Sequence, residues 1–393
     1  MAIGDPAEIK NFKLLGHDPS AAWGGGSLVE VKDGFAYVGA VGTSGYNGPE
    51  GFTVHDVSDP AKPRRVAEVH APPGTHNHKV RLVGDDLLYV NYEQIRNGDG
   101  EKVRTGIKIY DIRDPKNPKE AGFYDMPGSG PHRFGVDNER KLAFIPNHAE
   151  GWRNRVSWTV DISDPLKPER ISLWGLPEQD LSMNLPYKEP ESPDLTTTCH
   201  GPATIRGDRM FCGFWGGGMG IADCSDLPSV KHISQLRFAP PFVGATHTVW
   251  PVGDQPYVVV TDEARSHTNY PDSQFMWIVD IREETHPIPV ATFMPDRENF
   301  LHRGKRYGAH NILEDSPSEG PWANIIFLTY FNAGLRAVDL SDPFHPKELG
   351  HFVPACDFGE PCVQSNDIGA DEEGRLYLID RNGAGMHILE YTG

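Results

Sequence analysis

One short unit returns seven times along this chain, and the repetition constrains the fold more than any other feature. In its full copies the unit is an apolar segment that ends in Asp, followed by a turn of the Ile-Ser-Asp-Pro type, as in residues 160–165. The acidic residues that end these segments are Asp56, Asp111, Asp161, Asp223, Asp280, Asp339 and Glu390. Successive markers are 55, 50, 62, 57, 59 and 51 residues apart, a period typical of β-propellers. The chain is therefore predicted to be an array of one unit.

Each copy of the unit is predicted to contain four β-strands. In the second copy these are residues 78–83, 87–92, 106–111 and 120–124. The segments are rich in β-branched and aromatic residues, and Gly-Asp-Asp or Asp-Pro turns separate them. In the Asp-Pro turn the carboxylate can accept from backbone N–H groups ahead of it, while Pro presets φ. No stretch has helical periodicity, so the predicted fold class is all-β.

The last copy lacks a fourth strand, because Gly393 follows its third strand directly. Residues 9–17 resemble the fourth strand at 346–352, and pairing the two ends of the chain closes the ring and removes an exposed edge. We therefore predict a seven-bladed β-propeller with four-stranded blades, formed by residues 1–393 as a single domain. The predicted blades are residues 23–70, 75–126, 130–176, 198–240, 245–295, 307–353 and 364–392, with residues 8–17 as the fourth strand of the seventh blade.

Charge limits the classes of partner. The sequence has 55 acidic and 37 basic residues and a net charge of −18. A phosphate backbone or an anionic membrane requires a basic patch, so neither nucleic acid nor a membrane is expected as a partner. No apolar run is long enough for a membrane span or a signal peptide. We expect a cytoplasmic protein that binds a small molecule; the sequence leaves the oligomeric state open.

The Asp-Ile-Ser-Asp-Pro units resemble LVIVD repeats, a sequence family of β-propeller proteins. Residues 161–165 carry the motif in full, and related forms recur along nearly the whole chain. The resemblance implies the propeller fold and says little about chemistry. Related units also occur in the selenium-binding protein and methanethiol oxidase family. That likeness is more distant, because this sequence lacks the Cys-rich N-terminal region of that family.

A histidine recurs at the start of the first predicted strand in five blades. These residues are His78, His132, His200, His247 and His310, with Asn366 in the same position of the seventh blade. First strands line the channel of a propeller, so the five imidazoles are predicted to meet at one mouth. Neutral imidazole is the commonest nitrogen ligand of divalent transition metals. We expect a metal site with His200, His247 and His310 as its core and His78 or His132 completing it. Iron(II) is the expected metal, with manganese, copper and zinc as alternatives.

The long connections are predicted to lie on the same face as the histidines. They are residues 41–50, 92–105, 176–197, 264–274, 297–309 and 354–365, whereas the turns of the opposite face are mostly minimal. Insertions of this kind gather where binding and catalysis occur on a rigid scaffold. Residues 176–197, 297–309 and 354–365 are candidates for a lid.

Further candidates follow from this placement. Residues at the ends of second strands can accept from the outer N–H of a metal-bound histidine, although solvated loop positions would look the same. These candidates are Glu93, His148, Asp262 and Glu263. Substrate contacts are expected from Arg133, Arg303, Arg306 and Arg381 to a carboxylate, from Trp215 and Trp152 to an apolar part, and from Asn366.

Three functions fit these residues. The first is an iron enzyme that activates oxygen to oxidise or cleave a small apolar or aromatic substrate, with or without a carboxylate. The second is a manganese or zinc lyase or hydrolase that acts on a carboxylate-containing substrate, with a histidine as proton acceptor. The third is a binding scaffold without chemistry. The number of histidines favours the first function, and the basic residues favour the second.

Overall fold

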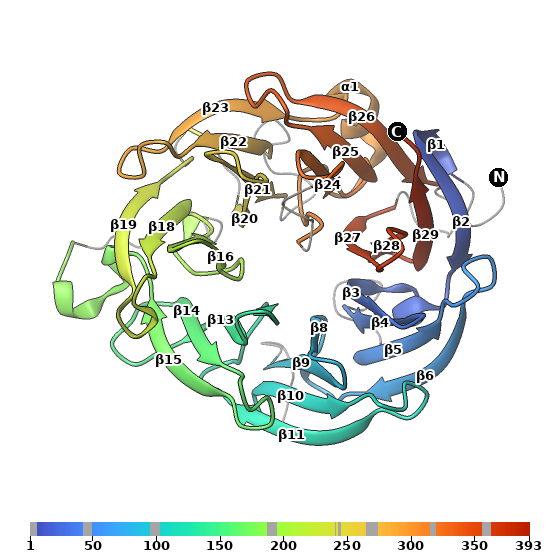
Figure 1. The fold of residues 1–393 in the computed structure, drawn as a ribbon, viewed down its shortest axis with the longest axis horizontal. Coiled ribbons are helices and arrows are strands. Elements are labelled where there is room, and N and C mark those ends of the chain that lie inside the picture. Colours follow the sequence, from blue (N-terminus) through green and yellow to red (C-terminus); the bar gives the residue numbers. More distant parts are fainter. Residues whose placement is uncertain are drawn as a thin grey trace.

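The computed structural model is a ring of seven antiparallel sheets around a common axis (Figure 1). It describes residues 6–41, 49–94, 103–186, 195–239, 241–242, 245–264, 274–314, 320–355 and 363–393. The predicted all-β class and the seven-bladed propeller are confirmed.

The blades follow one another around the ring in chain order. Blade 1 contains β3 (Gly26–Lys32), β4 (Phe35–Ala40), β5 (Gly51–Asp56) and β6 (Arg64–His70). Blade 2 contains β8 (Val80–Val83), β9 (Leu87–Gln94), β10 (Gly106–Asp111) and β11 (Lys119–Asp125), and β7 (Thr75–His76) also pairs with β9. Blade 3 contains β12 (Gly135–Asp137), β13 (Leu142–His148), β14 (Arg155–Asp161) and β15 (Glu169–Trp174). Blade 4 contains β16 (Thr204–Arg206), β17 (Arg209–Gly213), β18 (Met219–Asp223) and β19 (Lys231–Leu236).

The remaining three blades complete the circle. Blade 5 contains β20 (Ala245–Pro251), β21 (Tyr257–Glu263), β22 (Met276–Asp280) and β23 (Ile288–Phe293). Blade 6 contains β24 (Ile325–Thr329), β25 (Leu335–Asp339), β26 (Lys347–Pro354) and β1 (Pro6–Lys10). Blade 7 contains β27 (Ser365–Ala370), β28 (Leu376–Asp380), β29 (Met386–Tyr391) and β2 (Phe12–Asp18).

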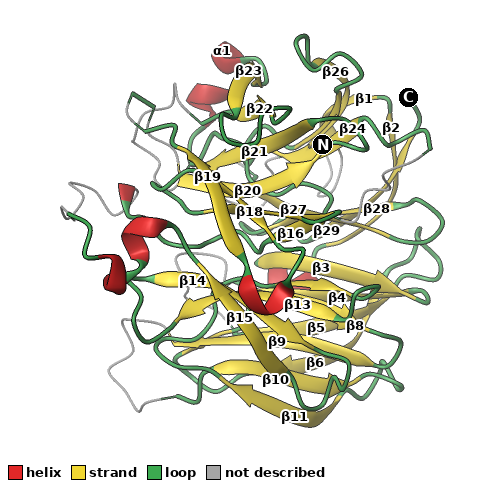
Figure 2. Ribbon diagram, turned by 60° about the vertical axis from the view of Figure 1, so that its left-hand side comes forward, coloured by secondary structure: helices red, strands yellow, loops and turns green. Residues whose placement is uncertain are grey.

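Helical structure among the described residues is limited to single turns. They are α1 (Arg297–Phe300) and the 3-10 turns η1 (Ala21–Gly24), η2 (Pro177–Gln179), η3 (Leu181–Met183), η5 (Leu227–Ser229) and η6 (Leu301–Arg303). Figure 2 shows α1 and several other helical turns toward the left side of the ring, whereas many turns between strands lie on the right. Within the described part of the chain, no helix has the length and apolar character to cross a membrane.

The repeated Asp of the sequence has the structural role that its motif predicts. The carboxylates of Asp161 and Asp339 accept from the backbone N–H two residues ahead, at 2.7 and 2.8 Å. The same contact recurs at Asp56, Asp111, Asp223 and Asp280. Just before this turn, the strand that ends in the Asp of each of these six blades has a bulge against the strand that follows it in the chain. The bulge and the side-chain contact together give each blade the same tight turn.

The N-terminal segment closes the ring, as predicted, but it is divided between two blades. Residue Asn11 has a φ of 54°, and this left-handed position separates β1 from β2. Strand β2 pairs with β29 in blade 7, whereas β1 pairs with β26 in blade 6. The single strand predicted for residues 8–17 is therefore corrected to two strands, and only β2 completes the last blade.

Candidate metal centre

The five repeated histidines lie together at one mouth of the channel, and His76 joins them. Their rings form an arc in the order His76, His78, His132, His200, His247 and His310, with successive centroids 3.9, 4.4, 5.2, 4.7 and 4.3 Å apart. All but His132 are buried. They surround a cavity of about 260 Å³. Its other lining residues are Ser27, Val41, Lys79, Arg133, Trp215, Glu263, Arg306, Asn366 and Arg381.

Close contact between neighbouring blades sets the spacing of the arc. His200 lies four residues before the start of β16, and its backbone N–H donates to the carbonyl of Gly213 at 3.0 Å. A Cβ at Gly201 would lie 2.2 Å from the backbone oxygen of His247 in the next blade. A glycine is therefore required beside His200 for the two blades to approach and for the two imidazoles to meet.

His76 is a member of the arc that the repeat does not predict, because no other blade has a histidine at the corresponding position. The sequence nevertheless contains a signal in His76-Asn77-His78. Alternate residues of an extended chain point to the same side. An His-x-His segment at the start of a channel strand therefore presents two imidazoles to one mouth.

Carboxylates support one end of the arc. Glu93 Oε2 accepts from His132 Nδ1 at 2.6 Å, and Glu50 Oε2 lies 3.4 Å from His76 Nδ1. A carboxylate on Nδ1 fixes the imidazole so that Nε2 remains for a metal. Among the described residues, His78 Nε2 is buried without a hydrogen-bond partner. This end of the arc has the features of a metal site.

The nitrogen atoms of this end lie at distances compatible with one metal ion. Ligand atoms of His76, His78, His132 and Glu93 are all within 4.8 Å of one another. A second group at the same spacing consists of His200, His247 and Glu263. Glu93 takes the position predicted for it beside a histidine. Glu263 Oε1 faces His310 Nε2 at 3.8 Å, so it lies in the cavity itself.

Burial favours the neutral form of the five repeated histidines. It lowers the pKa of His78, His200, His247 and His310 well below the usual value, and neighbouring cationic groups add to this effect. The pKa of His132 is lowered less, because the Glu93 carboxylate opposes the effect of burial. Burial alone would raise the pKa of Glu93, but His132 and Arg155 outweigh it and lower that pKa. The site therefore offers neutral nitrogen ligands next to an ionised carboxylate.

Arginines support the other end of the arc. Arg306 Nη1 donates to Glu263 Oε1 at 2.8 Å, and Arg381 Nη1 donates to Asn366 Oδ1 at 3.2 Å. Arg133 Nη1 lies 3.0 Å from His247 Nδ1. The ring of Trp215 lies over His200 with a centroid distance of 4.7 Å. These predicted substrate residues do line the cavity.

Besides Glu93, which lies behind His132, four predicted site residues are not in the cavity lining, which corrects their expected placement. Arg303 pairs with Glu8 and lies over the ring of Phe300, while Trp152 packs against the core of blade 3. His148 ends β13 outside the lining. Asp262 precedes Glu263 on β21, and alternate strand residues point to opposite faces. Of the three predicted lid segments, residues 187–194 and 356–362 lie outside the described residues.

Asp262 instead forms a buried polar contact behind the cavity. Its carboxylate accepts from Trp277 Nε1 at 2.7 Å and from Thr246 Oγ1 at 3.1 Å. Burial raises the pKa of Asp262 to about 7, although both hydrogen bonds oppose this. Between about pH 4 and pH 7 the unfolded chain loses this proton while the folded protein retains it. The free energy of unfolding therefore falls as pH rises through that interval.

The substitution Asp262→Asn should remove this loss. Asparagine retains an acceptor for Trp277 and cannot ionise, so we expect the free energy of unfolding at pH 7.5 to rise by on the order of 2–4 kcal/mol. Urea unfolding from pH 5 to pH 8 measures the change, which should grow with pH. The exposed residue Glu139 provides the control Glu139→Gln. Equal stability of Asp262→Asn and the wild type at pH 7.5 would contradict this account of Asp262.

The comparisons with known proteins agree with the fold. Residues 24–70 match the LVIVD repeat model. This LVIVD repeat is blade 1 together with the residues that lead into it, so the resemblance expected from the sequence is confirmed there. No curated protein sequence matches the chain.

Solved structures similar to this chain are β-propellers of several kinds. A hypothetical selenium-binding protein from Sulfolobus tokodaii has 12% identity and a TM-score of 0.58, over 96% of this chain and 94% of that one. The periplasmic gluconolactonase of Pseudomonas aeruginosa has 13% identity and a TM-score of 0.55, over 90% and 95%. The RRP9 WD40 repeats have 9% identity and a TM-score of 0.59, over 97% and 99%. At these identities the likeness shows the fold alone.

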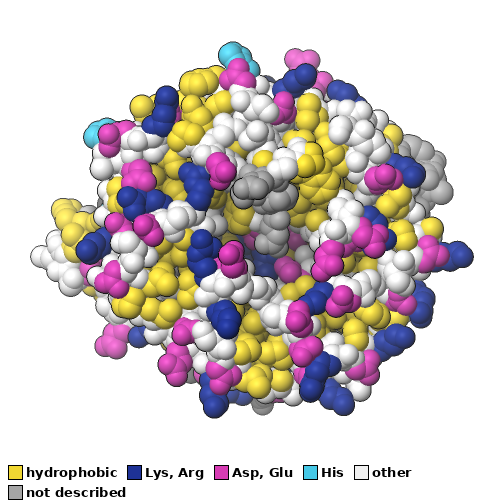
Figure 3. Space-filling model, viewed as in Figure 1, with side chains coloured by type: hydrophobic (Ala, Val, Ile, Leu, Met, Phe, Trp, Pro, Cys, Tyr) yellow, Lys and Arg dark blue, Asp and Glu magenta, His cyan; other side chains and the backbone are white. Residues whose placement is uncertain are grey.

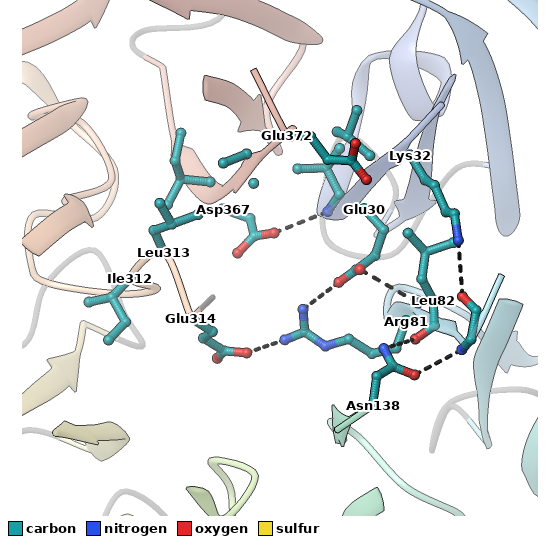
Figure 4. A pocket seen from close by; sticks show the side chains of 16 residues that line it. Glu30, Lys32, Arg81, Leu82, Asn138, Ile312, Leu313, Glu314, Asp367 and Glu372 are labelled. Atoms are coloured by element: carbon teal, nitrogen blue, oxygen red, sulfur yellow. Dashed lines mark hydrogen bonds and ion pairs between the residues drawn. The ribbon is translucent and has the colours of Figure 1, made fainter. Parts of the chain in front are cut away.

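The LVIVD repeat also contributes to a second cavity of about 260 Å³ at the opposite mouth. Figure 3 shows a hollow at the centre of the ring, with acidic and basic side chains in it. In Figure 4 the guanidinium of Arg81 lies between Glu30 and Glu314. Arg81 Nη1 donates to Glu30 Oε1 at 2.6 Å, and its other terminal nitrogen pairs with Glu314.

Glu314 connects the two mouths. Its Oε1 accepts from Arg133 Nη2 at 2.8 Å, and Arg133 in turn contacts His247. Nearby, Lys79 is buried with its Nζ 3.2 Å from Ser27 Oγ. An ion-paired chain of side chains thus extends along the channel from the histidine arc to the second cavity. The sequence does not predict a role for Glu314. The residue follows a segment in which Ile312 forms only an isolated bridge with Leu328, so it resembles a solvated loop residue.

Proposed function

We propose that the protein is a metal-dependent enzyme that holds a divalent transition metal with His76, His78 and His132. The observation that carries this proposal is the buried Nε2 of His78, which has no partner among the described residues and lies between two imidazoles that carboxylates orient. Buried polar atoms usually have partners, and an unpaired one indicates an absent ligand. The pairing of carboxylate with histidine is typical of metal centres. The donor set therefore fits a metal.

Iron(II) is the metal that we propose, with copper, zinc and manganese as alternatives. Three neutral nitrogen ligands on one side leave positions open for oxygen and substrate. When bound, iron would supply the capacity to activate dioxygen. The residues of the chain would bind the metal and position the substrate. The buried arc limits access of water, and the ring of Trp215 provides a flat apolar surface beside His200. We propose a small apolar or aromatic molecule as the substrate and partner, because the cavity is below the size of typical drug-like sites.

A second function is favoured by the hydrogen bond of His310. Its Nδ1 donates to the backbone oxygen of Asn366 at 2.7 Å, so Nε2 carries the lone pair and faces the cavity. A neutral imidazole in this position can accept a proton from a bound substrate. With manganese or zinc in place of iron, the site would suit a lyase or hydrolase that acts on a carboxylate-containing substrate.

Metal analysis and oxygen uptake test these proposals. Protein purified without oxygen should contain about one iron per chain, and it should consume oxygen with an aromatic substrate from a small panel. A chelator should abolish the uptake, and iron should restore it. Turnover with manganese or zinc and no oxygen uptake would favour the lyase or hydrolase. If the purified protein neither contains nor binds stoichiometric metal, the proposal is wrong.

A further inference from the structure

The cavity has opposite electrostatic character at its two ends. Carboxylates support the end with His76, His78 and His132, through Glu50 and Glu93. Guanidinium groups support the end with His247, His310 and Asn366. A cation is stabilised at the first end, and the same field stabilises an anion at the second. The difference is independent of which metal binds.

The cavity lining is rich in basic residues, although the protein as a whole is acidic. The chain has a net charge of −18, yet the lining contains four basic residues, Lys79, Arg133, Arg306 and Arg381, and one acidic residue, Glu263. From below the cavity, Glu314 pairs with Arg133. Glu263 pairs with Arg306 at 2.8 Å. Two further carboxylates lie close by, because buried Asp367 acts on Lys79 and buried Asp380 acts on Arg381. Among the described residues that line the cavity, however, the cationic side chains outnumber the carboxylates, so the lining favours an anionic ligand.

We propose that Arg306 and Arg381 bind a carboxylate group of the substrate, across the cavity from His76, His78 and His132. That the bound molecule is a substrate rests on the function proposed above, whereas the anion site does not depend on that function. Guanidinium groups present planar pairs of N–H donors that match a carboxylate. Trp215 lines the same cavity, so a flat apolar body can extend from the carboxylate toward it. The ligand class is a small aromatic or alkenyl monocarboxylate.

Calorimetric titration of the full-length, chelator-treated protein with sodium benzoate tests the anion site. Benzamide has the same shape without the charge, and we expect it to bind at least about 10-fold more weakly than benzoate. The variant Arg381→Gln should weaken benzoate binding by about 10-fold or more. Arg113 provides the matched control, because it is an exposed arginine paired with Asp111 in a turn. Arg113→Gln should bind benzoate as the wild type does.

Arg306 requires a charge-balanced variant, since its removal alone exposes Glu263. The double variant Arg306→Gln/Glu263→Gln removes both charges, and it should also bind benzoate about 10-fold more weakly or worse. Circular dichroism and thermal unfolding establish that each variant is folded. A loss of binding in this folded double variant assigns the effect to the guanidinium and not to a liberated carboxylate.

The metal-free state of the protein separates this proposal from the metal site. Chelator-treated wild type should bind benzoate whether or not the purified protein retains metal. The anion site is refuted if benzoate does not bind the wild type, if benzamide binds equally well, or if the Arg381 variant is unaffected. Tighter binding of inorganic phosphate than of benzoate would show that the site takes a different class of anion and would overturn the proposal.

Discussion

Replacing both His78 and His132 with glutamine should abolish stoichiometric metal binding and leave the propeller folded. The double variant loses two of the three proposed nitrogen ligands. Loss of a residue that only orients a ligand typically lowers metal affinity by about 10- to 100-fold. We therefore expect the loss of two ligands to lower metal affinity by more than about 100-fold. Glutamine retains the size and polarity of the side chain. Elemental analysis of the purified variant measures the metal, and circular dichroism measures the fold.

Two controls make this result specific. His345 is an exposed histidine with 83% of its side chain accessible, and His345→Gln should retain full metal. The double variant His200→Gln/His247→Gln tests the other end of the arc, which the sequence alone indicates as the ligand core. Full metal in His78→Gln/His132→Gln, together with loss of metal in His200→Gln/His247→Gln, would place the ion there and contradict the assignment made from the structure.

Removal of residues 1–18 should prevent the chain from forming a stable monomeric propeller. The deletion takes away β2, leaves β29 as an unpaired edge, and removes Phe12, which packs against Phe327 and Tyr391. It also leaves buried His55 without Asp18, whose Oδ2 lies 2.7 Å from His55 Nδ1. Losses of each kind cost about 3–5 kcal/mol. Their sum is comparable with the whole stability of a typical domain.

A shorter deletion provides the matched control. Removing residues 1–10 deletes β1 and leaves β2 in place, so blade 7 remains complete and only the outer edge of blade 6 changes. We expect this variant to remain monomeric with a moderately lower melting temperature. Size-exclusion chromatography and thermal unfolding compare the two. If the chain that begins at residue 19 were monomeric with wild-type melting, the role assigned to β2 in ring closure would be wrong.

The features that the sequence predicts are those set by local repetition. The Asp markers fix one turn per blade, and the recurring histidine fixes one position at the channel, so the ring and the arc both follow. His132 and Glu93 are a further example, because each lies at a defined end of a strand. These features require only the blade register.

The features that the sequence does not predict depend on contacts between blades. Strand β21 is buried along its whole length, so no alternation of polar and apolar residues shows which of Asp262 and Glu263 faces the channel. Arg133 directs its guanidinium down the channel to Glu314, 181 residues away in the sequence. Asn11 divides the N-terminal segment because its backbone turns, which the resemblance to a fourth strand does not reveal.

The ion-paired chain of Arg81, Glu314 and Arg133 has a consequence for the proposed enzyme. These side chains are joined by ion pairs and lie between the histidine cavity and the second cavity. For the enzyme proposed above, we expect the product to leave through the opening by which the substrate enters, because this ion-paired chain separates the two cavities. Spent product and fresh reactant would then exclude one another, and competitive product inhibition is the kinetic signature of such a dead end.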